Sequence, residues 1–339
     1  MPNQSVLKVQ PIGFQWPMEN PFIFCAHHQD EYPQGNKSLG PSVSLSGRSL
    51  GSDFSGKDGF SMYHGEEVPG FPVHPHRGFE TVTIVLEGFV DHFDSKGATG
   101  RYGQGDVQWL TTGAGCQHAE MFPLLSEDKP NPLELFQVWL NLPARDKFVE
   151  PHFKMLWAEK IPTALIPGPG GGSSTLRCIA GAMSGLQSLA PNPSSWAADP
   201  ENKVGIFLAT LAPGGSLILP ARSPSLVRNL YYYQGGTPLR VAGQDIPPSR
   251  RVKLSGDQDI LINAGEGECR FIVLEAEPIG EPVVNYGPFV MNTEEEIREA
   301  IRDYRRTQFG GWPWERDDPV HPRSKGRFAR HMDGREEVP

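Results

Sequence analysis

Short apolar runs bounded by glycine or proline recur along most of the chain. Their β-branched and aromatic side chains are typical of strands, and their spacing of about 8–15 residues is typical of a sandwich or barrel. Examples are ETVTIVLEG (80–88), GDVQWLTTG (105–113), LELFQVWLNL (133–142), KVGIFLATLAPGG (203–215), LVRNLYYYQGG (226–236) and CRFIVLEAEP (269–278). The pattern therefore predicts an all-β chain. Segments 44–72 and 166–178 are predicted loops, and strand-rich runs on both sides of the second loop indicate two β domains.

One segment near the C-terminus, 292–306, has helical periodicity instead. Thr293 and Glu296 have the spacing of a capping box, in which each side chain bonds to the backbone of the other. The Ile297–Ile301 face is apolar, so we expect this helix to pack on one of the domains. The residues after Trp314 are polar with mixed charge, which predicts a disordered tail at 315–339.

Composition narrows the class of protein. The formal net charge is −9 and no basic patch is visible, so direct nucleic-acid binding is not expected. The chain has no run of 18 apolar residues, so no membrane span is expected. The first ten residues do not resemble a signal peptide. The four cysteines lie far apart, which argues against a zinc ribbon and a disulfide framework. We therefore expect a cytoplasmic protein, or a nuclear one if the source is eukaryotic.

Two short pairs carry the candidate chemistry. His74 and His76 stand one residue apart just before a predicted strand, and His118 and Glu120 repeat this spacing further along. Because residues i and i+2 of a strand face the same way, each pair would share a face. Two such pairs on neighbouring strands can converge on one ion. Three imidazoles and a carboxylate suit Fe(II), Mn, Ni, Cu or Zn.

A second carboxylate competes for the fourth position. Glu80 lies four residues after His76 and is also in phase with that face. The spacing alone therefore leaves open whether Glu80 or Glu120 completes the site.

Three longer motifs resemble the pirin family of bicupins, within the cupin superfamily. They are HPHRGFETVT (74–83), GDVQW followed by GxGxxHxEM (105–121), and EPVVNYGPFVMNTEEEI (281–297). The resemblance covers about residues 20–310 and implies two cupin barrels face to face, with a short C-terminal helix. The implied division is a metal-binding cupin at 1–160 and a second cupin without metal ligands at 161–314. The sequence agrees with this division, because no histidine occurs from Cys178 to Trp314.

The resemblance also implies the ligand set. Carried over to this chain, one divalent metal, with Fe(II) expected first, would be held by His74, His76, His118 and Glu120. Glu80 would then stand behind a ligand and orient a histidine. Many pirins have an aliphatic pair before the third ligand histidine. This chain has Cys116 and Gln117 there, and Gln117 is expected beside the site, where it could alter substrate contacts or a partner surface.

Two functions follow from the resemblance. Some pirins resemble flavonol 2,4-dioxygenases, which open quercetin with O2, and here Glu120 would be both ligand and catalytic base. The alternative is a metal-dependent or redox-sensing module, such as a transcriptional co-regulator, that binds a protein partner without catalysis. A flavonol-like aromatic polyphenol and O2 are the partners expected in the first case. We expect a monomer in both.

Overall fold

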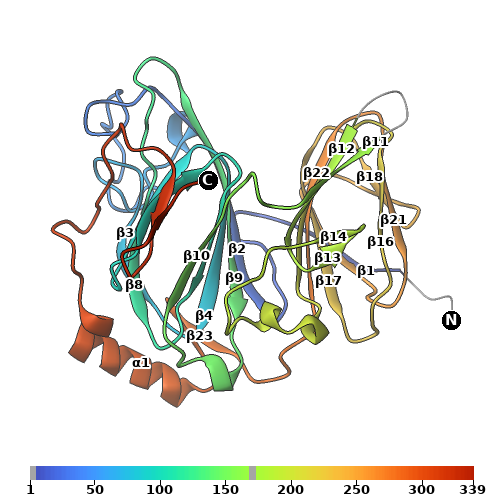
Figure 1. The fold of residues 1–339 in the computed structure, drawn as a ribbon. Coiled ribbons are helices and arrows are strands. Elements are labelled where there is room, and N and C mark those ends of the chain that lie inside the picture. Colours follow the sequence, from blue (N-terminus) through green and yellow to red (C-terminus); the bar gives the residue numbers. More distant parts are fainter. Residues whose placement is uncertain (1–4, 168–172) are drawn as a thin grey trace. The chain divides into compact units, whose positions relative to one another are not determined.

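The computed structural model describes residues 5–167 and 173–339, and most of its regular elements are β-strands (Figure 1). Residues 168–172, within the loop predicted at 166–178, lie outside the described part. The rest of that loop was predicted wrongly, because β11 (Thr163–Pro167) and β12 (Ser173–Ala180) are paired strands. The loop predicted at 44–72 is confirmed up to the start of β3 at Gly70.

The first of two compact units comprises Ala26–Glu159 and Glu281–Pro339, and its two sheets together are called the first barrel. One of its sheets has five strands, in the order β10 (His152–Leu156), β7 (Val107–Thr111), β4 (Phe79–Glu87), β9 (Asn131–Asn141) and β2 (Phe22–Tyr32). The other has six, in the order β26 (Glu336–Glu337), β25 (Phe328–Arg330), β6 (Thr99–Gly103), β5 (Phe89–Asp94), β8 (Cys116–Met121) and β3 (Gly70–His76).

The second unit comprises Met1–Cys25 and Lys160–Gly280. Its larger sheet has the order β1 (Val6–Pro11), β20 (Arg250–Leu254), β17 (Val227–Gly235), β22 (Cys269–Ala276), β15 (Gly205–Leu211), β12 and β11. Its smaller sheet has the order β16 (Ser216–Leu219), β21 (Ile260–Ala264), β18 (Leu239–Val241) and β19 (Gln244–Ile246). A short hairpin joins β13 (Ala182–Met183) and β14 (Leu186–Gln187).

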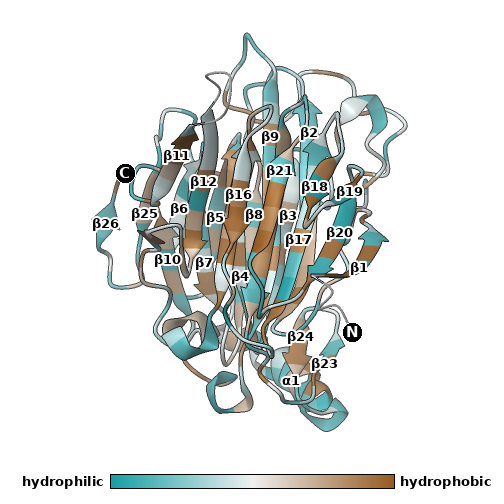
Figure 2. Cartoon of the chain, turned by 90° about the vertical axis from the view of Figure 1, so that its right-hand side faces the viewer, coloured by the Kyte–Doolittle hydropathy of each residue, from teal (hydrophilic) through white to brown (hydrophobic). Residues whose placement is uncertain are grey.

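Each unit has its own apolar core, and the all-β prediction is confirmed. Strands carry bands of hydrophobic and hydrophilic residues along their length, as expected where one face is buried (Figure 2). The core of the second unit is drawn from both of its sheets and includes Leu176, Phe207, Leu230, Ile262 and Phe271. No histidine occurs in this core cluster.

The unit boundaries differ from those expected at 160 and 314. Strand β1 pairs with β20, so the N-terminal strand belongs to the second unit, whereas residues after Gly280 return to the first. The pairing of β1 with β20 joins residues more than two hundred positions apart. A local pattern of apolar and polar residues contains no information on such partners.

Helix α1 (Glu294–Thr307) follows the hairpin of β23 (Val284–Tyr286) and β24 (Phe289–Met291). Both halves of the predicted capping box between Thr293 and Glu296 are present. Ile297 and Ala300 are buried against Phe289 and Met291, with Ile301 packed at the side. The predicted apolar face is therefore confirmed, and it packs in the first unit.

The tail at 315–339 is ordered, in contrast to the disorder expected from its composition. Strand β25 extends the six-stranded sheet by pairing with β6. Arg101, which is buried, forms a two-point ion pair with Asp91 and donates to the backbone carbonyls of His321, Pro322 and Lys325. The polar composition predicted a solvated segment. Its backbone carbonyls instead accept hydrogen bonds from the buried Arg101, a contact that the sequence of the tail alone does not indicate.

Within the described residues, no helix has both the length and the apolar character needed to cross a membrane.

Candidate metal centre

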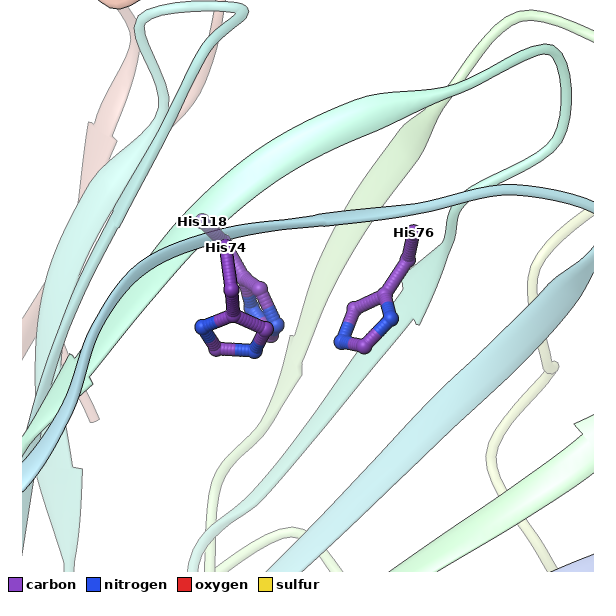
Figure 3. A group of neighbouring side chains, drawn as sticks. All are labelled: His74, His76 and His118. Atoms are coloured by element: carbon purple, nitrogen blue, oxygen red, sulfur yellow. The ribbon is translucent and has the colours of Figure 1, made fainter. Parts of the chain in front are cut away.

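Strands β3 and β8 bring the two predicted pairs together. They run antiparallel, with His74 opposite His118 and an irregularity between Phe71 and His74. The three imidazoles project to the same side of their strands (Figure 3). Ring centroids are 4.4 Å apart for His74 and His118, 4.9 Å for His76 and His118, and 4.8 Å for His74 and His76. One ligand nitrogen from each ring lies within 4.8 Å of the others.

Burial keeps these imidazoles neutral. It lowers the pKa of His74 to about 4, and the pKa values of His76 and His118 fall well below the ordinary histidine value for the same main reason. A neutral imidazole has one nitrogen lone pair available for a metal. At neutral pH the cluster therefore presents three potential ligands rather than three repelling cations.

Backbone carbonyls select the nitrogens that face the site. Because a carbonyl only accepts, Nδ1–H of His74 donates to the oxygen of Pro72 over 2.8 Å, and Nδ1–H of His76 donates more weakly to that of Pro288 over 3.4 Å. This leaves the lone pair on Nε2 of both rings, an arrangement common among metal-binding histidines. Neither nitrogen of the fully buried His118 has a hydrogen-bond partner among the described residues. A bound ion would supply a partner for the one of these nitrogens that carries the lone pair.

Glu120 stands beside the histidines, with Oε2 3.7 Å from Nε2 of His118. Oε2 accepts a hydrogen bond from Nε2 of Gln137 over 2.9 Å. Oε1 lies 3.1 Å from the hydroxyl of Thr83 and 3.4 Å from that of Tyr102. Burial raises the pKa of Glu120, and the nearby His92 and these donors lower it. The carboxylate is thus buried, oriented by donors and directed toward His118.

Glu80 is separated from this group. Strand β3 ends at His76, Gly78 adopts a φ of 89°, and β4 then enters the other sheet. Oε1 of Glu80 accepts from Nε1 of Trp109 over 3.0 Å and from the hydroxyl of Thr111 over 2.7 Å. The phase relation with His76 assumed one continuous strand, which the turn interrupts. The expectation that Glu80 orients a ligand histidine therefore lacks support in this geometry.

Gln117 faces away from the site. Its Nε2 donates to the carbonyls of Gln308 and Gly311, over 2.8 and 3.1 Å, and its Oε1 accepts from the hydroxyl of Tyr304 over 2.9 Å. Because successive residues of a strand face opposite sides, a residue next to His118 cannot share its face. Gln117 holds the C-terminal end of α1 against β8, and the expected substrate contact is replaced by a structural one.

Several residues that contact Glu120 were not predicted from the sequence. Gln137, Thr83 and Tyr102 come from three other strands, so no local spacing links them to the histidine pairs. His92 lies opposite Glu120 in the pairing of β5 and β8, and its ring centroid is 5.5 Å from that of His118. The spacing of His92 and Asp94, which repeats the one-residue gap of the ligand pairs, is a signal that could have identified it.

The donor set fits a divalent transition-metal ion. Three neutral imidazoles, with the Glu120 carboxylate beside them, would give mixed nitrogen and oxygen ligation, and ligand type alone does not select among Fe, Mn, Ni, Cu and Zn. Aromatic side chains flank the imidazoles. The ring of Phe71 lies 6.4 Å from that of His74, and the ring of Trp139 lies 5.3 Å from that of His76.

Comparison with known proteins gives a consistent assignment. The family model described as Pirin matches residues 10–140, and the model described as Pirin C-terminal cupin domain matches residues 207–310. Pirin of Homo sapiens is 36% identical over 257 residues, which cover 74% of this chain and 81% of that protein. A Pseudomonas aeruginosa protein whose name proposes quercetin 2,3-dioxygenase activity is 37% identical over 241 residues, covering 71% of this chain and 79% of its own.

Among solved structures, a quercetin 2,3-dioxygenase from Acinetobacter baumannii has a TM-score of 0.70 and 25% identity. The match covers 91% of this chain and 98% of that one. Both family models and the fold agree with two cupin domains in one chain. The chain therefore belongs to the pirin family of bicupins.

Proposed function

We propose that the first barrel binds one divalent transition metal through His74, His76, His118 and Glu120, and that the loaded protein opens a flavonol such as quercetin with O2. The observation that carries this proposal is the convergence of three neutral imidazoles beside a buried, hydrogen-bonded carboxylate. Fe(II) is the metal we propose first. The names of the Pseudomonas and Acinetobacter proteins support a flavonol as the substrate class.

The residues of the chain divide the work. A bound metal would supply a Lewis acid and a template for the flavonol oxygens and O2. Glu120 would accept the proton of the flavonol 3-hydroxyl, because its Oε2 is directed toward the ligand cluster. The aromatic rings of Phe71 and Trp139, both half-buried beside the histidines, would flank a flat polyphenol.

Metal analysis followed by an anaerobic titration with quercetin tests this function. We expect one metal per chain, a shift of the flavonol absorption on binding, and loss of that absorption only when O2 is admitted. The protein should be loaded in turn with Fe, Mn, Ni and Cu, since the ligand set does not select among them. If no loaded form consumes a flavonol, the enzyme proposal fails and a metal-dependent binding module takes its place.

A further inference from the structure

Gln137 connects the candidate base to the opposite sheet. It lies on β9, directly opposite Thr83 of β4, and its side-chain amide lies between Thr83 and Glu120. Nε2 donates to Oε2 of Glu120 over 2.9 Å, while Oε1 lies 2.5 Å from the hydroxyl of Thr83. The reversed amide would place its oxygen against the carboxylate, where two acceptors repel. The carboxylate therefore decides which way the amide points.

The two oxygens of Glu120 are held differently. Oε1 faces the hydroxyls of Thr83 and Tyr102 over 3.1 and 3.4 Å. The single hydrogen of Thr83 has two acceptors within reach, and the amide oxygen of Gln137 is the nearer. Oε2 has the shortest contact of the carboxylate, the one from Gln137, and Oε2 is also the oxygen 3.7 Å from His118. The oxygen that faces the imidazoles is thus the one that Gln137 holds.

We propose that Gln137 is a positioning residue for the metal centre. It restricts the rotation of the Glu120 carboxylate so that Oε2 stays directed toward His118, and it thereby sets metal affinity and the placement of the base. The inference rests on the proposed ligand set, in which Glu120 is the oxygen ligand. Residues that orient metal ligands change affinity by about 10–100-fold when they are replaced.

The chain offers a matched control in Gln108. It lies on β7 and is paired with Thr83 from the other side, so the two glutamines flank the same threonine. Gln108 is fully buried in the same barrel, and its amide has no hydrogen bond to Glu120 or to any other described residue. Gln108→Leu therefore reproduces the change of size and polarity made by Gln137→Leu but leaves the carboxylate contact intact.

The experiment compares these two variants in the 339-residue chain. Apo protein is titrated with Ni(II) against a competing chelator, and the Co(II) form is examined by its visible absorption. We expect Gln137→Leu to bind Ni(II) about 10–100-fold more weakly and to show a changed Co(II) spectrum, because the oxygen ligand is no longer fixed. Gln108→Leu should retain the wild-type affinity and spectrum.

Two results would overturn the proposal. One is a Gln137→Leu protein with wild-type affinity and spectrum, and the other is an equal loss in Gln108→Leu. If Gln137→Leu does not fold, Gln137→Met provides the same test, because it keeps the side-chain length and has no donor for Oε2. Neither measurement requires turnover, so a wild type that binds metal but never consumes a flavonol contradicts the proposed function without affecting this inference.

Discussion

His74 and His118 occupy directly opposed positions in the antiparallel pair of β3 and β8, with their ring centroids 4.4 Å apart. Strand β3 contributes His74 and His76 to the four candidate ligands, and β8 contributes His118 and Glu120. A bound ion would therefore cross-link two strands that are distant in the sequence. Ligand removal should consequently affect metal content far more than it affects the barrel, because the two strands are also held by their backbone pairing.

Replacing His74 and His76 together by Ala should abolish metal binding. The second unit has no histidine in its core, and the sequence has none from Cys178 to Trp314, so no comparable nitrogen site is available there. Metal per chain, measured after dialysis of loaded protein, should fall from one to near zero. His152→Ala is the control, since His152 is exposed on β10 of the same barrel. Retention of one equivalent by the double variant would disprove a single site in the first barrel.

Glu120→Gln should separate the two roles proposed for this residue. An amide oxygen ligates metal weakly, so some binding should remain, but an amide cannot accept the flavonol proton. Turnover per bound metal should fall about 10²–10⁴-fold, the usual cost of losing a general base. The comparison must be made per metal bound, because ligand loss otherwise mimics base loss. Unchanged turnover per metal would show that Glu120 serves only as a ligand.

Arg101→Met should destabilise the first unit and release the tail. The substitution leaves Asp91 buried without its ion-pair partner and removes three hydrogen bonds to tail carbonyls. Breaking a buried ion pair in this way costs about 3–5 kcal/mol of unfolding free energy, measurable by urea unfolding. Arg316→Met is the control, because its pair with Asp318 is exposed and such pairs contribute about 0–1 kcal/mol. Equal effects of the two substitutions would contradict the structural role of Arg101.

Acidification should weaken docking of the tail through His321. Its imidazole stacks on Phe93, and burial, assisted by the nearby cations of Arg101 and Lys325, lowers its pKa from 6.5 to about 3. Between these two values the undocked tail binds more protons than the docked one. The contribution of His321 to docking is therefore complete above pH 6.5 and is lost progressively as the pH falls toward 3.

Hydrogen exchange of the β25 amides between pH 7 and 4, corrected for the intrinsic rates, measures this effect. His321→Gln should remove the component that begins near pH 6.5. If the substitution leaves the acid profile of β25 unchanged, other groups control docking.

Local spacing was sufficient to predict several features of this protein. The alternation of strand residues placed His74 with His76 and His118 with Glu120, because the side-chain period of two depends only on backbone geometry. The capping box of α1 and its apolar face were likewise readable, since all their contacts start from residues within one or two helical turns. The all-β character followed from side-chain shape and turn residues, which act over similarly short distances.

Only the tertiary structure decided the remainder. A turn at Gly78 breaks the phase between His76 and Glu80, whose carboxylate contacts Trp109 and Thr111 instead, and Gln117 became a contact for α1 rather than for a substrate. Gln137 reached Glu120 from a strand of the opposite sheet, and the charged tail found its partners on β5 and β6. These outcomes depend on which distant segments pair. The packing of whole sheets determines this pairing. The short motifs that supply the ligands therefore do not specify which strands become neighbours.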